Sequence, residues 1–172
     1  MCGTLEYLIN ELYRVGALVT AGRGEGRGVD LRSEVILSKP DIYELVIRAW
    51  IAKLEGLNFD FILSMGLRDL AYASTLAWIR KCGVGYVVAE GGSVKPVGLL
   101  AGKKVLLLSE STRSAVGRVK EVILALGRAN SVPVAYTVLM DNEEGDARIS
   151  SWGIGFLPLL KASRVLRAAS SD

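Results

Sequence analysis

The segment Lys104-Val105-Leu106-Leu107-Leu108-Ser109-Glu110-Ser111-Thr112-Arg113-Ser114-Ala115-Val116-Gly117 decides the fold class of this chain. Its apolar run predicts a buried strand that delivers the carboxylate of Glu110 to a small polar loop, after which a helix begins. Backbone N–H groups at a helix start would suit a phosphate, together with the neighbouring hydroxyls of Ser111, Thr112 and Ser114. An ordinary strand-to-helix turn with serine caps explains the same segment about equally well.

Short apolar segments alternate with amphipathic ones on both sides of this stretch. The expected strands are Phe59 to Ser64, Gly85 to Ala89, Val105 to Leu108 and Val132 to Met140. The expected helices are residues 5–16, 38–55, Asp69 to Lys81, Ser114 to Leu126 and Pro158 to Ala169. This alternation predicts a doubly wound α/β fold, a parallel sheet covered on both faces. Ligands of such sheets bind at the carboxyl ends of the strands, here the loops after Ser64, Leu108 and Met140.

The N-terminal part of the chain has a different pattern. Two short extended pieces, Ala17 to Thr20 and Gly28 to Leu31, flank a segment rich in glycine and arginine, residues 21–28. That segment could bind phosphates or RNA as a flexible basic loop, but its composition favours a hairpin turn.

The segment Asp141-Asn142-Glu143-Glu144-Gly145-Asp146 could hold a hard cation, although an acidic surface turn is the favoured interpretation. Trp50 and Trp78 are expected in the core or in an interface.

Composition limits the possible functions. A chain of 172 residues, 51% of them hydrophobic, can form one globular domain. No histidine is present, which excludes imidazole bases, histidine triads and histidine metal sites. The net charge of +3 is too small to indicate nucleic-acid binding. Two distant cysteines, Cys2 and Cys82, suggest neither a disulfide framework nor a cysteine metal site.

Features that the sequence lacks indicate the cellular location of the protein and the kind of organism it comes from. No apolar run approaches the ~20 residues that span a bilayer. Residues Met1 to Glu11 lack the basic-then-apolar order of a signal peptide. We therefore expect a cytoplasmic protein without a membrane partner. The absence of glutamine and the scarcity of asparagine, cysteine and methionine point weakly to a thermophilic source.

With these segments the chain resembles the orotate phosphoribosyltransferases. The family signature is a hydrophobic strand, two acids, two further residues, and a loop rich in threonine and glycine that opens a helix. In the family, the acids hold the ribose hydroxyls of phosphoribosyl pyrophosphate and the loop holds its 5-phosphate. Glu110 matches the second acid and Ser109 replaces the first, while Ala115-Val116 replaces the glycines. The resemblance implies Glu110 as the catalytic residue and, as substrate-binding residues, Ser109, Ser111, Thr112, Arg113, Ser114 and Gly117.

Three further segments fit the family in the same order along the chain. Residues 66–71, Gly-Leu-Arg-Asp-Leu-Ala, resemble its pyrophosphate loop without the usual second glycine, which implicates Gly66 and Arg68. Residues 141–145 resemble the Asp-Arg-x-x-Gly segment, with Asn142 in place of the substrate-binding arginine. Near the start, Arg23 takes the place of a substrate-contacting lysine and is followed by the family's Asp-x-Arg at residues 30–32.

The family's basic mobile loop, which closes over the site of the neighbouring subunit, has only a reduced counterpart. The corresponding residues 86–96 contain a single basic residue, Lys95. Cations placed against the leaving pyrophosphate supply much of the rate in such a reaction, since losing one commonly costs ~10²–10³. The reduced loop therefore favours a catalytically impaired or redirected site.

The resemblance implies one phosphoribosyltransferase-like domain over residues 1–172, with a small hood from about residues 16–36 and 147–156. It implies a homodimer that uses Mg²⁺ to transfer phosphoribose from phosphoribosyl pyrophosphate to orotate, a step of pyrimidine nucleotide synthesis. The alternative is a non-catalytic relative that binds a nucleotide, a sugar phosphate or a partner protein in a regulatory role. Neither hypothesis involves nucleic acid or a membrane.

Overall fold

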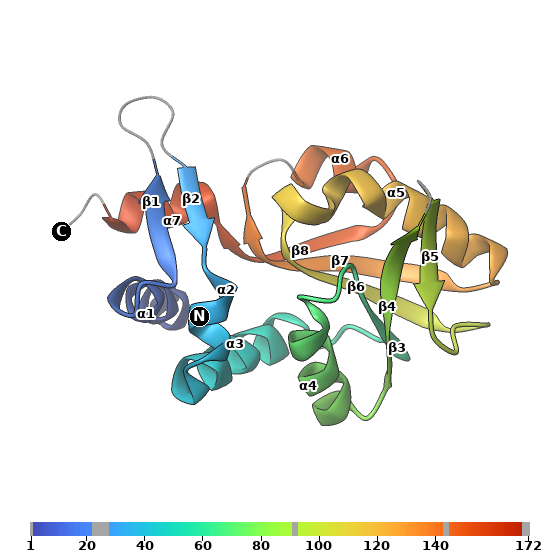
Figure 1. The fold of residues 1–172 in the computed structure, drawn as a ribbon, viewed down its shortest axis with the longest axis horizontal. Coiled ribbons are helices and arrows are strands. Elements are labelled where there is room, and N and C mark those ends of the chain that lie inside the picture. The colour runs from blue at the N-terminus through green and yellow to red at the C-terminus, as the bar shows by residue number, and fades with distance from the viewer. Residues whose placement is uncertain (1, 22–27, 91–92, 143–144, 170–172) are drawn as a thin grey trace.

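The computed structural model describes residues 2–21, 28–90, 93–142 and 145–169 of the chain (Figure 1). The helices are α1 (Cys2–Arg14), α2 (Ser33–Leu37), α3 (Pro40–Lys53), α4 (Leu70–Arg80), α5 (Thr112–Arg128), α6 (Asp146–Ser150) and α7 (Ala162–Ala169). The strands are β1 (Leu18–Ala21), β2 (Gly28–Leu31), β3 (Phe61–Ser64), β4 (Gly83–Glu90), β5 (Ser93–Val97), β6 (Lys104–Ser111), β7 (Val132–Asp141) and β8 (Gly155–Lys161). In this part of the chain, no helix has the length and apolar character needed to cross a membrane.

A six-stranded sheet in the order β5-β4-β3-β6-β7-β8 forms the centre of the molecule. The strands from β4 to β8 in this order run parallel, and β5 pairs antiparallel with β4. The prediction of four parallel strands in one sheet is therefore confirmed. Ser64 of β3 pairs with Leu108 of β6, so these two strands end side by side.

Helices cover both faces of this sheet, as the doubly wound prediction requires. Successive side chains of β6 alternate between the faces: Leu106 and Leu108 join one core, and Val105 and Leu107 join the other. Helices α1, α3, α4 and α7 supply the first core, and α5 and α6 supply the second (Figure 1). Burial on both faces explains why the central strands are apolar at nearly every position.

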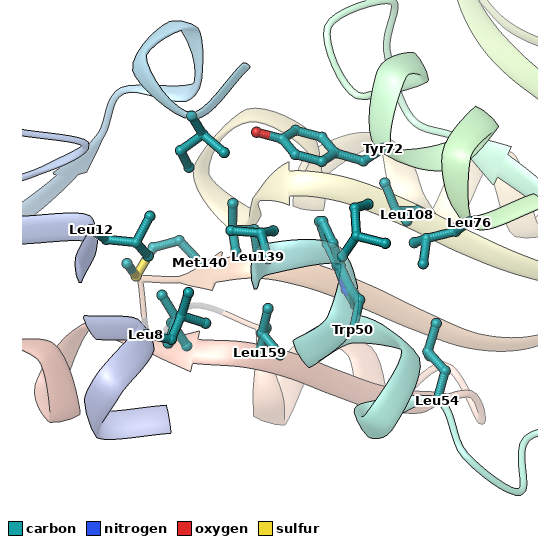
Figure 2. Close-up of a cluster of buried hydrophobic side chains, with 14 of the residues drawn as sticks. Leu8, Leu12, Trp50, Leu54, Tyr72, Leu76, Leu108, Leu139, Met140 and Leu159 are labelled. Atoms are coloured by element: carbon teal, nitrogen blue, oxygen red, sulfur yellow. The ribbon is translucent and has the colours of Figure 1, made fainter. Parts of the chain in front are cut away.

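The first core is built around the buried Trp50 of α3, which lies between the sheet and α4 (Figure 2). Its indole N–H donates to Thr137 Oγ1 at 3.0 Å, and the Thr137 hydroxyl donates to the Leu157 carbonyl oxygen at 2.7 Å. Each polar group thus has a partner, which removes the cost of burying it unpaired. The expectation of a core position holds for Trp50, whereas Trp78 is 81% exposed.

Several assignments of local structure differ from the sequence prediction, and the short helix α6 is one of them. Residues 158–161 are part of β8, so the helix expected from Pro158 begins only at Ala162. Pro158 is compatible with a strand because β8 lies at the sheet edge, where no ladder N–H is required on the open side. The short helix α2 was not predicted, and residues 93–97 of the expected loop form strand β5.

The two segments expected to share a hood contribute to different cores. The antiparallel pair β1–β2 packs with α1 and α7 on the side of the first core. Ile149 and Ile154, from the expected second hood segment, join the second core across the sheet. The pairing of Leu18 with Leu31 agrees with the predicted hairpin, while its turn, residues 22–27, lies outside the described residues.

Candidate functional site

The carboxyl ends of β3, β6 and β7 meet at one edge of the sheet, where the strand–helix alternation predicted a ligand site. The Met65 N–H donates to the Leu108 carbonyl oxygen at 2.8 Å and ties the end of β3 to β6. The Asn142 N–H donates to Thr112 Oγ1 at 3.0 Å and ties the end of β7 to the start of α5. The loops after the three strands are therefore neighbours, as predicted.

The junction between β6 and α5 contains no separate loop. Strand β6 extends to Ser111 and α5 begins at Thr112, two residues before the predicted start. Ser111 is the N-cap, and its Oγ accepts hydrogen bonds from the Arg113 N–H at 3.2 Å and the Asn142 side-chain amide at 2.9 Å. The segment that resembles a phosphate loop is thus the first turn of a 17-residue helix, whose N–H groups and dipole attract anions.

A pocket of about 220 Å³ opens in front of this helix start. It is lined by Val29, Asp30, Leu31, Glu110, Ser111, Arg113, Met140 and Asn142. One wall is therefore strand β2, and the other is formed by the ends of β6 and β7 and the start of α5. Segments far apart in the sequence thus enclose it between them.

Arg113 crosses this pocket to the hairpin. Its Nη1 donates to Asp30 Oδ1 at 3.2 Å, and the two side chains are 60% and 55% exposed. Exposed ion pairs of this kind contribute only about 0–1 kcal/mol. A ligand phosphate can therefore compete with Asp30 for the Arg113 guanidinium.

Glu110 extends from the end of β6 toward the first core and meets the N-terminal segment. Its Oε2 accepts a hydrogen bond from the Ser33 hydroxyl at 2.6 Å. Ser33 is buried at the start of α2, the helix that the sequence did not predict. The sequence offered no signal for this contact, because the two residues are 77 positions apart.

Asp69, which the sequence analysis did not select, lies beside Glu110. It is only 6% exposed, and its Oδ1 accepts a hydrogen bond from the Glu110 N–H at 2.9 Å. Burial raises the pKa of Asp69 to about 7; the negative charge of Glu110 adds to this rise, and the Glu110 N–H and the charge of Arg118 oppose it. The available signal was that residues 66–71 lack the second glycine that is usual in the resembled loop.

Two buried tyrosines flank the acids. The Tyr136 hydroxyl is hydrogen-bonded to Ser109 Oγ at 2.6 Å, and burial raises its pKa. Burial also raises the pKa of Tyr72, and the charge of Glu110 adds to this effect. Ser33 lies close enough to the Tyr72 hydroxyl to oppose this rise in pKa, although no hydrogen bond of normal geometry to that hydroxyl is found within the described part of the chain. In Figure 2 the hydroxyl points away from α4. Both hydroxyls therefore stay protonated around neutral pH.

Four of the residues selected from the sequence line the pocket together: Glu110, Ser111, Arg113 and Asn142. Ser109 and Thr112 are fully buried and are not among its lining residues. Ser109 is hydrogen-bonded to Tyr136, and the Thr112 hydroxyl donates to Asp141 Oδ1 at 3.3 Å. Both residues therefore help to hold β6, β7 and the start of α5 together around the site.

Gly117, Gly66 and Arg68 are not among the residues that line the pocket. Gly117 is exposed within α5, and a Cβ added there would contact nothing within 4 Å. Gly66 and the exposed Arg68 belong to the loop after β3. Arg23 and the side chain of Ser114 lie outside what the structure describes.

A metal site is not preformed in the described ranges. Within them, no group of three or more His, Cys, Asp or Glu side chains is arranged to hold an ion. Asp141, from the acidic segment, is 1% exposed and accepts from the Thr112 hydroxyl. Glu110 and Asp30 are the carboxylates among the residues that line the pocket, and Mg²⁺ commonly uses one or two carboxylates together with substrate phosphates.

The buried acid makes stability depend on pH. With its pKa raised from 3.8 to about 7, folded Asp69 keeps a proton that the unfolded chain has released, so stability falls as pH rises from about 4 to 8. We expect the free energy of unfolding of Asp69→Asn to decrease by roughly 2 to 4 kcal/mol less than that of wild type over this pH range. Urea unfolding at a series of pH values measures this free energy. Asp41→Asn, at an exposed acid of α3, is the control, and equal pH profiles for wild type and Asp69→Asn would contradict the assignment.

Comparison with known proteins places the chain among relatives of one kind, although no family model matches it. It is 27% identical over 156 residues to an orotate phosphoribosyltransferase of Sulfolobus acidocaldarius, covering 88% of this chain and 78% of that protein. It is 28% identical over 162 residues to the orotate phosphoribosyltransferase of Staphylothermus marinus, covering 91% of this chain and 78% of the relative.

Solved structures agree on the fold. Orotate phosphoribosyltransferase from Aeropyrum pernix superposes with a TM-score of 0.78 at 17% identity, over 96% of this chain and 99% of that one. The UMP synthase of Leishmania donovani gives a TM-score of 0.74 at 18% identity, over 96% of this chain and 38% of that one. The chain thus has the fold of the phosphoribosyltransferases and resembles the orotate phosphoribosyltransferases in sequence over most of its length.

Proposed function

We propose that the pocket in front of α5 binds a 5-phosphoribosyl group, and that phosphoribosyl pyrophosphate and orotate are its ligands in a transferase reaction. One observation carries the proposal: Arg113 and Ser111 at the helix start and the carboxylate of Glu110 line the same pocket. The first pair suits a phosphate and the carboxylate suits sugar hydroxyls. The relatives named orotate phosphoribosyltransferase support the choice of ligands.

The phosphate would lie at the N-terminus of α5. The first-turn N–H groups of a helix attract anions, and the Arg113 guanidinium offers a fork of charged donors beside them. Its exposed pair with Asp30 is weak enough to be exchanged for a phosphate. The Asn142 amide, which is bonded to Ser111, provides a further polar group in the same wall.

The ribose would lie against Glu110. A carboxylate accepts hydrogen bonds from neighbouring hydroxyls, and at present Ser33 supplies one such donor at 2.6 Å. The pocket, at about 220 Å³, is smaller than the ~300–1,000 Å³ typical of sites for drug-sized ligands. This size supports a sugar phosphate as the recognised group, with any base or leaving group outside the pocket.

In the transfer reaction a nitrogen of the base would attack C1 of the ribose while the bond from C1 to pyrophosphate breaks. Glu110 would hold the ribose hydroxyls and stabilise the positive charge that develops on the ring. Glu110 is the residue that would hold Mg²⁺, which would supply charge neutralisation for the departing pyrophosphate. Arg113 would keep the 5-phosphate in place through the reaction.

A non-catalytic relative that binds a nucleotide or sugar phosphate in a regulatory role is the second candidate. The β4–β5 hairpin favours it, because within the described ranges that hairpin carries Lys95 as its single basic residue. A transferase needs cations against its leaving pyrophosphate, whereas a binding protein does not.

We also propose that the chain forms a homodimer through an exposed face that includes α4. Ala71, Ser74 and Trp78 recur at intervals of three and four residues, a spacing that places them on one side of this helix, and all three are exposed. Trp78 is 81% exposed, and Leu67, in the turn before the helix, is 70% exposed. Large aromatic side chains in such positions are typical of protein interfaces, and small neighbours such as Ala71 and Ser74 allow a second chain to approach closely.

Arg113→Ala should weaken binding of ribose 5-phosphate tenfold to hundredfold, because a charged hydrogen bond contributes ~1–3 kcal/mol. Isothermal titration calorimetry measures the dissociation constant. Arg128→Ala, at the other end of α5, is the matched control and should bind like wild type. Equal affinities of wild type and Arg113→Ala would remove Arg113 from the phosphate site.

Glu110→Gln should abolish turnover if the chain is a transferase, because the amide keeps the shape of the side chain but loses its charge. Release of pyrophosphate from phosphoribosyl pyrophosphate, with orotate, uracil and purines in turn, is the measurement. Wild-type rates of ~1–10³ s⁻¹ would establish a transferase. The regulatory candidate is favoured if no base yields pyrophosphate; Glu121→Gln on α5 controls for the charge change.

Trp78→Glu should convert the protein to a monomer, because it places a charge at the centre of the proposed interface. Sedimentation equilibrium gives the mass of wild type and variant. Leu124→Glu, at an exposed apolar position of α5, is the control and should leave the dimer intact. A monomeric wild type would refute the proposed dimer.

A further inference from the structure

We propose that a second pocket, formed by α1, α3, β8 and α7, binds a nucleoside polyphosphate. It has a volume of about 350 Å³ and shares no lining residue with the pocket in front of α5. The two pockets are therefore separate sites, and binding at the second goes beyond the transferase or regulatory function proposed for the first.

Four cationic side chains line this second pocket, and we call them the basic cluster. They are Lys53, Lys161, Arg164 and Arg167. Three elements contribute them, the end of α3, the end of β8, and α7, which continues directly from β8 (Figure 1). The lining residues that the structure describes include no acid. Since the net charge of the whole chain is only +3, four cations around one pocket are a local concentration of charge.

The basic cluster has an electrostatic cost for α7. Arg164 and Arg167 are three residues apart on this helix, a spacing at which equal charges repel each other. The first turn of α7 contains Arg164 and no acidic residue, although the positive end of the helix dipole favours an acid there. An anion bound in the pocket would offset both unfavourable interactions.

Glu6 of α1 lies near the basic cluster but holds it only weakly. Its Oε1 is 3.9 Å from Arg164 Nη2, and the Glu6 side chain is 65% exposed. Exposed ion pairs contribute little to stability, so a phosphate group can take the place of this carboxylate. A phosphate also carries more charge than a carboxylate and matches the planar fork of donors on a guanidinium.

The rest of the lining is mostly apolar, which indicates an organic ligand. Leu5, Phe156, Pro158 and Leu159 contribute to it, and Ser163 adds a hydroxyl. An inorganic anion would gain nothing from these apolar side chains, whereas the flat face of a nucleobase can pack against them. The volume also lies within the ~300–1,000 Å³ that is typical of small-molecule sites. Because four cations call for more than one phosphate, a nucleoside diphosphate or triphosphate fits the pocket best.

Calorimetric titration with ATP in the absence of Mg²⁺ tests the proposal. It is performed in the Arg113→Ala variant, so that the pocket in front of α5 contributes little to the signal. One ATP should bind per chain. Adding Lys53→Gln and Arg167→Gln together should weaken this binding at least tenfold, because both changes remove a charged donor from the pocket.

A matched pair of substitutions controls for the loss of two positive charges. Lys120→Gln with Arg128→Gln removes one lysine and one arginine from exposed positions of α5 and should leave the affinity for ATP unchanged. Thermal unfolding verifies that each variant is folded. The variant with Lys53→Gln and Arg167→Gln should unfold at the same temperature as its parent or a higher one, because a repulsion within the basic cluster is removed.

Two further probes separate the phosphates from the rest of the ligand. Inorganic triphosphate should bind at least tenfold more weakly than ATP, because it cannot use the apolar lining. Adenosine, which lacks the phosphates, should show no binding. Equal affinities for ATP and inorganic triphosphate would refute a nucleotide as the ligand.

The site itself is refuted if ATP does not bind the Arg113→Ala variant. It is also refuted if the addition of Lys53→Gln and Arg167→Gln leaves the affinity for ATP unchanged. Failure of the function proposed above is recognised separately, since it appears as the absence of ribose 5-phosphate binding to wild type and involves no residue of the basic cluster.

Discussion

The parallel pairing of β3 with β6 is the constraint on which the rest of the site depends. It places Ser64 beside Leu108, so the loop after β3 and the start of α5 emerge next to each other. The hydrogen bond from the Glu110 N–H to Asp69 then links the two ends directly. Because both strands are buried on both faces, neither can shift its register without exposing apolar side chains to water.

The N-terminal segment completes the pocket through two polar contacts with the sheet edge. Ser33 donates to Glu110, and Asp30 pairs with Arg113. The two residues that would recognise ribose and phosphate are thus the same two that hold this segment against the sheet. A ligand in the pocket would compete with Ser33 and Asp30 for these side chains, and its binding would then be coupled to the position of the N-terminal segment.

Two adjacent carboxyl groups are the main charged feature of this edge of the sheet, and cations contribute less. Asp69 and Glu110 lie side by side, and the β4–β5 hairpin contributes only Lys95 among its described residues. In the proposed transfer reaction, cations would have to stabilise the departing pyrophosphate, so the charges at this edge bear directly on which of the two candidate functions the site performs. The fold and the sequence relatives connect the chain to the phosphoribosyltransferases.

By itself the sequence determined the α/β class, the parallel core strands and the edge of the sheet where Glu110, Ser111, Arg113 and Asn142 meet, because hydrophobic periodicity and strand–helix alternation are local signals. Only the tertiary structure decided the contacts between distant segments. Ser33 meets Glu110 across 77 positions, and Asp69 becomes a buried acid only once α4, α5 and the sheet surround it. The apolar run after Pro158 fits a helix or a strand equally well, and its place at the sheet edge resolves the ambiguity. Burial and long-range pairing depend on the packed whole, and no short stretch of sequence encodes them.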